Sequence, residues 1–283
     1  MSILTVPGPL VSTQWLADNL MNKDIRIIDC SYFLEKSKSG PIAKSGRPEW
    51  EKGHIPNSIY IDLLEELSDR STKLPFMMPS KEQFQNIMSQ KGIGNDNIVI
   101  TYDRENVTWA SRVRLMFLNF GFRNIAVLDG GWKKWKAENR PISIENTNYG
   151  KSDFNASKID NRIFTDKKEV LKVIEDGSAV LINSLDKIAY EGGRIPESIN
   201  IPSSTLIDES NNSFLPPDSL RKIFEKAGIR KEDRIITYCG GGIAASCDAT
   251  ALMLAGYDNV SVYDGSMAEW LSDPNLPVEK GGK

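Results

Sequence analysis

The sequence predicts an α/β protein built from two tandem copies of one fold, each a mainly parallel β-sheet with helices on both faces. Short apolar runs alternate with helical stretches, which is the pattern of parallel strands joined by right-handed crossovers. The same motifs occur twice in the same order. A stretch rich in Ser, Asn, Asp and Lys, with little periodicity, separates the two copies. We therefore expect domains at residues 1–140 and 161–283, joined by a linker at 141–160.

The repeat consists of four motifs that return in the second half of the chain. Two contain apolar runs that predict buried strands, one contains an Ile-Pro pair, and one contains an Asp-Gly turn followed by a tryptophan. The corresponding pairs are 25–30 with 179–184, 51–59 with 191–199, 92–103 with 228–239, and 128–135 with 263–270. This shared order predicts a tandem duplication.

Helix starts are predicted at residues whose short polar side chains can accept a hydrogen bond from the first helical turn. Two of these residues are followed three positions later by Gln or Glu, which is the pattern of a capping box. The predicted N-caps are Ser12, Ser80, Asp166 and Asp218, with Gln83 and Glu169 as the partners in the two boxes.

The best candidate for chemistry is a thiol that follows a predicted strand in the second copy. Residues 235–238 form an apolar, β-branched run, and residues 243–255 form an Ala- and Leu-rich helical stretch that stops at Gly256. Cys239 and three glycines lie between them. Inward N–H groups of a glycine loop and the positive end of a helix both favour a thiolate. Cys239 is therefore the candidate nucleophile, with a buried structural thiol as the alternative.

The first copy differs from the second at this position. Where the second copy has Cys239, the first has Asp103, followed by Arg104-Glu105-Asn106 in place of glycines. A carboxylate cannot perform thiol chemistry, and charged side chains leave less room for inward N–H groups. We therefore expect the second copy to be catalytic and the first to be a supporting domain.

Composition excludes several classes of function. A net charge of −3 gives no electrostatic basis for binding nucleic acid or an anionic membrane. No apolar run is long enough to span a bilayer, and residues 1–22 do not resemble a signal peptide. Three cysteines suit a reducing compartment, so we expect a cytoplasmic protein. With one His and no ligand-spaced pair, we expect no metal and no organic cofactor.

Four motifs together resemble the tandem-domain rhodanese family, the thiosulfate and 3-mercaptopyruvate sulfurtransferases. They are Gly-His-Ile-Pro at 53–56, Asp-Gly-Gly at 129–131, Cys-Gly-Gly-Gly-Ile-Ala-Ala at 239–245, and Tyr-Asp-Gly-Ser-Met-Ala-Glu-Trp at 263–270. The resemblance implies two rhodanese domains, of which the second carries the catalytic cysteine. It also implies that Cys239 takes a sulfane sulfur from a donor to form a persulfide. That sulfur would then pass to cyanide, a thiol or a thioredoxin-like acceptor.

The resemblance assigns the anion-binding loop to the residues that follow the cysteine. Main-chain N–H groups at a helix N-terminus can hold a persulfide anion without titratable side chains. The loop residues expected to surround the persulfide are Gly240, Gly241, Gly242, Ile243, Ala244 and Ala245.

The chain departs from the family at several positions. Thiosulfate-type members carry basic side chains at the positions of Gly240 and Gly241, and mercaptopyruvate-type members carry a serine at the latter. Ala244 replaces a threonine, and Leu185 stands where the family's Asp-x-Arg motif places an arginine that meets the donor. A loop without a basic side chain favours 3-mercaptopyruvate over doubly charged thiosulfate.

Two further residues are candidates for contact with the donor. Arg194 stands where the second domain usually has the His of Gly-His-Ile-Pro, so it could supply a cation; a solvated surface arginine is the alternative. His54 matches a His that mercaptopyruvate-type enzymes bring to the active site, where it could shuttle a proton. The alternative for His54 is a residue that fixes the turn before Ile55.

Two other functions are alternatives to sulfur transfer. A phosphatase or arsenate reductase loop has the form Cys-x5-Arg, but Ala245 stands where the arginine is needed, which argues against oxyanion chemistry of that kind. A catalytically weak persulfide carrier or sulfur sensor stays open as an alternative, because the usual arginine and loop serine are replaced by Leu185 and Gly241.

Overall fold

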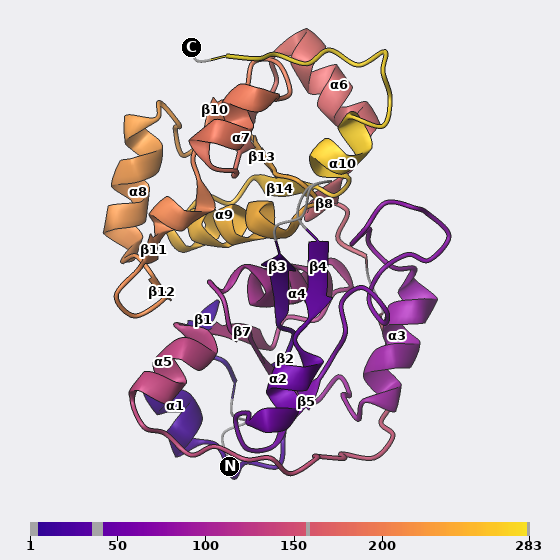
Figure 1. Ribbon diagram of the computed structural model, residues 1–283, viewed down its shortest axis with the longest axis vertical. Coiled ribbons are helices and arrows are strands. Elements are labelled where there is room, and N and C mark those ends of the chain that lie inside the picture. The colour runs from indigo at the N-terminus through magenta and orange to yellow at the C-terminus, as the bar shows by residue number, and fades with distance from the viewer. Residues whose placement is uncertain (1–4, 36–41, 157–158, 282–283) are drawn as a thin grey trace. The chain divides into compact units, whose positions relative to one another are not determined.

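The computed structural model describes residues 5–35, 42–156 and 159–281. The chain falls into two compact units (Figure 1). Unit 1 comprises Met1–Ser68, Pro79–Ile159 and Glu209–Ser213, and unit 2 comprises Asp69–Met78, Asp160–Asp208 and Phe214–Lys283. Each unit thus contains a short segment from the other half of the chain. The domain limits expected from the sequence stay a prediction. Within them, residues 1–4, 36–41, 157–158 and 282–283 lie outside the described residues.

Unit 1 contains a five-stranded parallel sheet with the strand order β1-β7-β6-β2-β5, and an antiparallel pair, β3 and β4. Its strands are β1 (Leu10–Val11), β2 (Ile25–Asp29), β3 (Tyr32–Glu35), β4 (Ile42–Ser45), β5 (Ser58–Tyr60), β6 (Ile98–Tyr102) and β7 (Ile125–Leu128). Its helices are α1 (Thr13–Asp18), α2 (Arg47–Lys52), α3 (Lys81–Gln90), α4 (Thr108–Asn119) and α5 (Gly131–Ala137).

Unit 2 contains a five-stranded parallel sheet with the order β8-β14-β13-β9-β10. The strands from the second half of the chain are β8 (Phe164–Thr165), β9 (Val180–Asn183), β10 (Ile199–Asn200), β11 (Ile207–Asp208), β12 (Ser213–Phe214), β13 (Ile235–Tyr238) and β14 (Val260–Tyr263). The helices are α6 (Lys167–Asp176), α7 (Lys187–Gly192), the 3-10 helix η1 (Ser203–Leu206), α8 (Pro217–Lys226), α9 (Ile243–Leu254) and α10 (Ser266–Trp270).

The two sheets have the same topology. Strands β8, β14, β13, β9 and β10 take the places in unit 2 that β1, β7, β6, β2 and β5 take in unit 1. The longest helix of each unit, α4 or α9, packs against the strand that precedes it and the strand that follows it. All residues of the central strands β6 and β13 are buried, as expected for parallel strands covered on both faces. The predicted α/β class with two copies is confirmed.

Each unit has a buried tryptophan at the equivalent position of its core. Trp135 and Trp270 are fully buried. The indole N–H of Trp135 donates to the carbonyl oxygen of Pro141 over 2.8 Å, and that of Trp270 donates to Pro277 over 2.9 Å. A buried indole needs such a partner for its N–H group. Both tryptophans therefore pack in the core of their own unit.

Three of the four predicted N-caps are confirmed. The side chain of each accepts the main-chain N–H of the residue three positions later; these caps are Ser12, Ser80 and Asp166. The prediction for Asp218 was wrong, because α8 already begins at Pro217 and Pro216 is its N-cap. Proline fixes φ near its helical value and needs no N–H partner, so it starts a helix without a side-chain cap.

The reciprocal bonds of the two capping boxes are replaced by tertiary contacts. Gln83 Nε2 donates to the carbonyl oxygens of Glu66 and Ser68, at 3.0 and 2.9 Å. The carboxylate of Glu169 instead accepts a hydrogen bond from Arg234 over 2.6 Å. Both side chains therefore bind distant segments of their own unit.

The two exchanged segments lie against equivalent turns. In unit 2, the main-chain N–H of Met78 donates to Oδ2 of Asp264 over 2.8 Å. In unit 1, Asn212 Nδ2 donates to the carbonyl oxygen of Gly130 over 3.4 Å. The turns at 129–130 and 264–265 belong to the repeated Asp-Gly motif. Each unit is thus completed by a segment that the other copy contributes.

The segment predicted as a linker runs along unit 1. Ser143 and His54 exchange main-chain hydrogen bonds of 2.8 and 2.9 Å. The guanidinium of Arg26 lies 4.2 Å from the ring centroid of Tyr149, and Phe154 is fully buried among other phenylalanines. Residues 141–156 therefore pack as part of unit 1.

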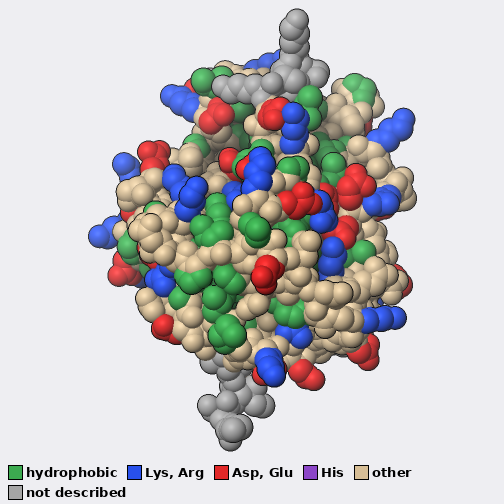
Figure 2. Space-filling model, turned by 60° about the horizontal axis from the view of Figure 1, so that its bottom comes forward, with side chains coloured by type: hydrophobic (Ala, Val, Ile, Leu, Met, Phe, Trp, Pro, Cys, Tyr) green, Lys and Arg blue, Asp and Glu red, His purple; other side chains and the backbone are tan. Residues whose placement is uncertain are grey.

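The surface shows mixed charge. On the face drawn in Figure 2, acidic and basic side chains are interspersed, without an extended area of one sign. This distribution agrees with the small formal net charge of −3. No described helix is long and apolar enough to cross a membrane.

Candidate active site

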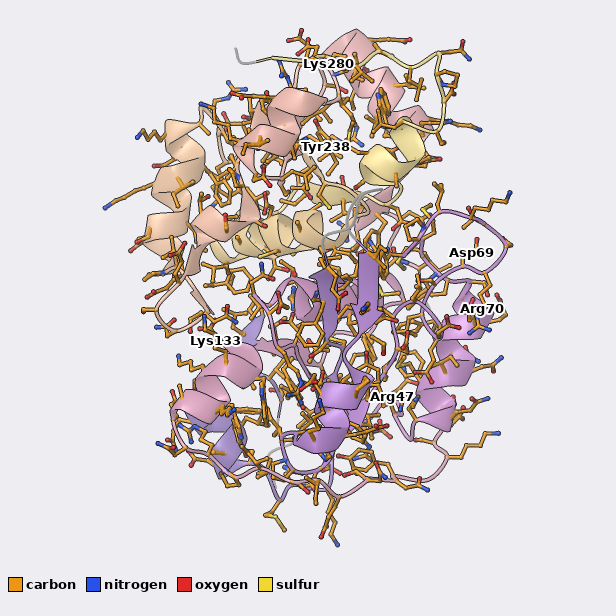
Figure 3. The ribbon with its side chains drawn as sticks, in the orientation of Figure 1. Arg47, Asp69, Arg70, Lys133, Tyr238 and Lys280 are labelled. Atoms are coloured by element: carbon orange, nitrogen blue, oxygen red, sulfur yellow. The ribbon has the colours of Figure 1, made fainter. Side chains whose placement is uncertain are left out.

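Cys239 lies at the carboxyl end of the central strand of unit 2. It directly follows Tyr238, the last residue of β13, which is labelled in Figure 3. Strand β13 lies between β9 and β14, and α9 begins at Ile243, four residues beyond the cysteine. The cysteine is 2% exposed, whereas Gly240 is exposed and Gly241 is half-buried. In parallel sheets, ligands bind at this end of the strands.

The three loop glycines serve different purposes. Gly242 has a φ of 79°, in the left-handed region that favours glycine, and it caps the start of α9. Neither Gly240 nor Gly241 has a φ in that region. A Cβ at Gly240 would meet no atom within 4 Å, and a Cβ at Gly241 would lie 3.9 Å from Phe76. The backbone therefore requires glycine at 242, while the other two glycines leave space open beside the cysteine.

The turn before α10 fixes the main chain of the cysteine. The N–H of Cys239 donates to Oγ of Ser266 over 3.1 Å, and its carbonyl oxygen accepts the N–H of Met267 over 3.0 Å. The carbonyl oxygen of Gly240 accepts the N–H of Ala268 over 2.8 Å. Among the described residues, none accepts the main-chain N–H of Gly241 or Ile243. Both N–H groups are therefore available to an acceptor at the start of α9.

The equivalent loop in unit 1 already holds an anionic group, the side chain of Asp103. Its Oδ1 accepts the main-chain N–H groups of Glu105 and Val107, at 3.0 and 3.1 Å. Its Oδ2 accepts the N–H of Ala110 over 2.9 Å. Burial raises the pKa of this carboxyl to about 6, and the three N–H bonds act in the opposite direction. The loop of this fold can therefore direct several N–H donors at the side chain that follows the central strand.

The donors around Asp103 have counterparts after Cys239. The loop of unit 1 is one residue longer, because Val107 and Gly242 are the left-handed N-caps of α4 and α9. Val107 therefore corresponds to Gly242. Ala110 corresponds to Ala245, since the carbonyl oxygens of both accept a threonine hydroxyl of the central strand. In unit 2 a thiol replaces the carboxylate, so an anion that extends beyond the sulfur can take up these donors. This comparison gives a geometric basis for the predicted persulfide site.

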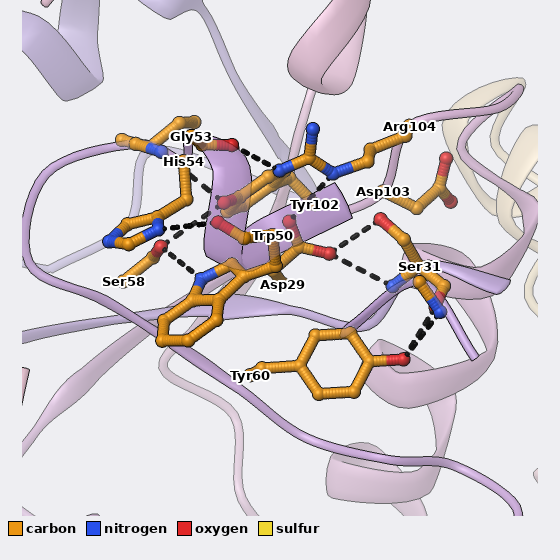
Figure 4. A network of polar contacts seen from close by, with 12 residues as sticks. Asp29, Ser31, Trp50, Gly53, His54, Ser58, Tyr60, Tyr102, Asp103 and Arg104 are labelled. Carbon is orange, nitrogen blue, oxygen red and sulfur yellow. Dashed lines mark hydrogen bonds and ion pairs between the residues drawn. The ribbon is translucent and has the colours of Figure 1, made fainter. Parts of the chain in front are cut away.

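A buried ion pair beside the loop of unit 1 has no counterpart in unit 2. Arg104 Nε lies 3.3 Å from Oδ2 of Asp29, and Arg104 also donates to the carbonyl oxygen of Gly53 over 2.6 Å (Figure 4). Burial raises the pKa of Asp29, and Arg104 acts against this rise. The corresponding residues of unit 2 are Asn183 and Gly240. Unit 2 therefore has neither charge at these positions, and its loop is more open beside Gly240.

Arg194, a predicted donor-binding residue, is fully engaged with other parts of unit 2. It is 3% exposed, and its guanidinium pairs with Glu279 over 3.2 Å and donates to the carbonyl oxygen of Gly281 over 2.5 Å. It also lies 4.5 Å from the ring centroid of Tyr190. The donor-binding role stays a prediction, and these contacts favour a structural role in holding the C-terminal segment.

His54, the other candidate, is buried in unit 1. Its Nδ1 lies 2.8 Å from the carbonyl oxygen of Trp50, and its Nε2 lies 3.1 Å from that of Glu145. The imidazole stacks on the indole of Trp50, with 4.2 Å between ring centroids (Figure 4). The proton-shuttle role stays a prediction. The contacts favour the alternative, a residue that fixes the turn before Ile55.

The other two cysteines are buried free thiols. Cys30 and Cys247 are fully buried. Burial raises the pKa of the Cys30 thiol well above its usual range, and the nearby Asp103 and Asp29 raise it further. A thiol that resists ionisation is a poor nucleophile. In the part of the chain that the structure describes, no cluster of three or more His, Cys, Asp or Glu side chains could hold a metal ion.

Sequence reasoning missed two contributors to the site. Ser266 lies in the repeated turn motif that the sequence identified, but nothing local indicated that its hydroxyl would bind Cys239. Phe76 comes from the other half of the chain and belongs to no motif.

A surface pocket lined by Arg221, Ile229 and Tyr257 lies by the amino end of β13, away from the cysteine.

Comparison with known proteins gives one consistent result. Residues 12–138 and 166–273 match the model of the Rhodanese-like domain. The chain is 32% identical to thiosulfate/3-mercaptopyruvate sulfurtransferase 1, mitochondrial, of Arabidopsis thaliana, over 98% of this chain and 80% of that protein. It is 29% identical to the 3-mercaptopyruvate sulfurtransferase of Escherichia coli strain K12, over 95% of this chain and 97% of that protein. The crystal structure of SseA from Escherichia coli, described as a 3-mercaptopyruvate sulfotransferase, has a TM-score of 0.83 and 27% identity, covering 91% of this chain and 98% of that one.

Proposed function

Because the chain belongs to the rhodanese family, we propose that it is a sulfurtransferase that moves a sulfane sulfur through a persulfide on Cys239. The observation that carries this proposal is the loop of unit 1, where three main-chain N–H groups hold the Asp103 carboxylate. The corresponding loop of unit 2 has a thiol at that position and open space beside Gly240. A terminal persulfide sulfur would occupy the place of the missing carboxylate oxygens.

In the first step, the Cys239 thiolate attacks the sulfur of 3-mercaptopyruvate. A sulfur–sulfur bond forms and the carbon–sulfur bond breaks, so the pyruvate enolate leaves with the bonding electron pair. The proton that the donor's thiol carried moves from the new persulfide to the enolate carbon. The products are pyruvate and a persulfide anion, whose charge the N–H groups of residues 241–245 would stabilise.

In the second step, a thiophilic acceptor attacks the terminal sulfur of the persulfide. With cyanide, a carbon–sulfur bond forms, the sulfur–sulfur bond breaks, and thiocyanate leaves while the Cys239 thiolate is restored. A thiol or a thioredoxin-like protein would take the same sulfur as its own persulfide. Neither step needs a metal or an organic cofactor, because the cysteine carries the sulfur and the main chain carries the charge.

We assign 3-mercaptopyruvate as the preferred donor. Thiosulfate carries two charges on a compact anion, and such a ligand binds best where basic side chains form charge-assisted hydrogen bonds. The loop offers Gly240 and Gly241 at the nearest positions, and Arg194 is paired with Glu279. 3-Mercaptopyruvate carries one carboxylate and a short carbon chain, which main-chain donors and apolar side chains can accommodate.

Turnover with cyanide as acceptor tests this function. Thiocyanate is measured with each donor in excess, for wild type, Cys239→Ser and the matched control Cys247→Ser. We expect many turnovers for wild type and Cys247→Ser, and none above background for Cys239→Ser. Activity that survives in Cys239→Ser would exclude the proposed nucleophile.

A second function, a persulfide carrier or sulfur sensor, is favoured by the lack of a basic side chain at Leu185 and Gly241. A carrier takes up one sulfur per chain and then transfers it slowly. In the turnover measurement it would release about one thiocyanate per Cys239, followed by little more.

We also propose a cytoplasmic location, which is supported by three free cysteines. Microscopy of the fluorescently tagged protein in its own cells would test it, since an organellar signal would contradict it.

A further inference from the structure

A segment from the first half of the chain lies beside the cysteine loop. Residues 69–78 belong to unit 2, and Asp69 and Arg70 at the start of this segment are labelled in Figure 3. The N–H of Asp69 donates to the carbonyl oxygen of Met77 over 3.0 Å, and the N–H of Met78 donates to Oδ2 of Asp264 over 2.8 Å. Asp264 and Ser266 belong to one turn, and Ser266 binds the N–H of Cys239. The segment and the cysteine loop are therefore fastened to the same turn.

Phe76 is the residue of this segment that meets the loop. Its side chain is buried, at 7% exposure, and its Cδ2 lies 3.9 Å from the place that a Cβ of Gly241 would take. Its φ is 61°, in the left-handed region that non-glycine residues rarely adopt. An unfavourable backbone conformation persists only where surrounding contacts hold it. The fold therefore keeps an aromatic ring against the open side of the loop.

The ring and the glycine complement each other. Gly241 does not have a left-handed backbone, so a larger residue could stand there, and its side chain would point toward Phe76. In this chain the ring provides an apolar surface on that side, and the main chain provides the polar groups. An apolar surface favours the carbon skeleton of a donor, and it disfavours a compact dianion that would lose water without gaining a partner.

We propose that Phe76 is a specificity-determining residue that selects small organic sulfur donors over inorganic thiosulfate. The proposal rests on the sulfurtransferase function given above. The ring contacts the carbon atoms next to the transferred sulfur, while the N–H groups of the loop bind the anionic end.

The segment exchanged into unit 1 supplies a matched position for the experiment. Asn212 lies in the other exchanged segment, five residues before the start of α8, as Phe76 lies five residues before the start of α3. Its φ is 63°, it is 5% exposed, and it binds Gly130 in unit 1. Asparagine therefore adopts this backbone conformation in the equivalent segment. Phe76→Asn removes the ring and keeps a residue that tolerates the left-handed region.

The experiment measures kcat/KM with 3-mercaptopyruvate and with thiosulfate for wild type, Phe76→Asn, Phe76→Leu and the control Asn212→Gly. The selectivity is the kcat/KM for 3-mercaptopyruvate divided by the kcat/KM for thiosulfate. We expect Phe76→Asn to lower this ratio by about tenfold. Phe76→Leu, which keeps an apolar side chain, should retain most of the ratio, and Asn212→Gly should not change it. If Phe76→Asn does not unfold cooperatively, Phe76→Gly, which relieves the backbone strain, takes its place.

The outcomes separate this proposal from the function it rests on. Wild-type turnover with an unchanged ratio in Phe76→Asn or Phe76→Gly would overturn the role of Phe76 alone, and the ring would then be a packing residue. An equal fall with both donors would overturn it as well. No turnover and no sulfur uptake by wild type with either donor would overturn the sulfurtransferase function, and the role of Phe76 with it.

Discussion

The main-chain N–H of Cys239 donates a hydrogen bond to the hydroxyl of Ser266 over 3.1 Å. Ser266 is fully buried, has a φ of 47°, and donates its own hydroxyl proton to the carbonyl oxygen of Tyr263 over 2.9 Å. The hydroxyl is thus both donor and acceptor, and it joins the end of β13 to the end of β14. The position of the nucleophile therefore depends on a side chain that lies 27 residues further along the chain.

Replacing Ser266 by Ala should lower both stability and activity. The change leaves the buried N–H of Cys239 without an acceptor, which costs about 1–3 kcal/mol. A displaced nucleophile should lower kcat by about tenfold or more. Urea unfolding and steady-state turnover measure the two effects. Ser246→Ala is the control, because the hydroxyl of Ser246 is also buried but donates to the carbonyl oxygen of Gly242. Equal losses in the two variants would contradict the specific role of Ser266.

Alanine should destabilise the protein at one of the loop glycines and have no effect at another. Gly242→Ala places a Cβ on a left-handed backbone, and we expect a loss of about 1–2 kcal/mol in the free energy of unfolding. Gly240→Ala should cost nothing, because its φ is not left-handed and its Cβ would meet no atom within 4 Å. Urea unfolding compares the two variants. A similar loss in both would mean that the loop needs glycine for space at 240 as well.

The buried carboxyl of Asp248 should make stability depend on pH. Burial raises the pKa of this carboxyl well above its usual range, and the nearby Ser184 acts in the opposite direction. Neither carboxyl oxygen has a hydrogen-bond partner among the described residues. The folded pKa exceeds the unfolded one, so this group's stability contribution is complete below about pH 4. It falls by about 1.4 kcal/mol per pH unit from the unfolded pKa up to the folded pKa.

Asp248→Asn removes this dependence and keeps the shape of the side chain. We expect the variant to match wild type near pH 4 and to be more stable than wild type at pH 8. Urea unfolding at the two pH values measures the difference. A variant that is less stable than wild type at pH 8 would show that the carboxylate has a partner in the folded protein.

Arg194→Ala and Glu279→Ala together test the role of the buried arginine. If Arg194 acts by holding the C-terminal segment, both variants should lose stability by similar amounts and keep the wild-type KM for the donor. The loss should be larger than that of a surface pair, because Arg194 is 3% exposed and a buried charge left alone is costly. A raised KM in Arg194→Ala alone would instead support the donor-binding role predicted from the sequence.

Features set by neighbouring residues could be predicted from the sequence. The caps at Ser12, Ser80 and Asp166 depend on a bond across three residues, and the sequence predicted each correctly. Strands such as β6 and β13 were visible as apolar runs, because parallel strands are covered on both faces. The internal repeat then gave the two-copy architecture without further information.

Features set by distant residues could not be predicted. Gln83 and Glu169 fit capping boxes locally, yet stronger tertiary partners bind their side chains. The exchange of segments 69–78 and 209–213 between the units leaves no periodic signal. Phe76 therefore remained unnoticed as a neighbour of the cysteine loop. Arg194 looked free because its partners, Glu279 and Gly281, lie about 85 residues away in the chain.

Intact mass spectrometry after incubation with 3-mercaptopyruvate tests the central claim most directly, because it observes the persulfide itself. Wild type and the control Cys247→Ser should gain one sulfur, about 32 Da, and lose it again on addition of cyanide. Cys239→Ser should gain nothing. A gain on Cys239→Ser, or no gain on wild type with either 3-mercaptopyruvate or thiosulfate, would contradict the assignment of Cys239 as the sulfur carrier.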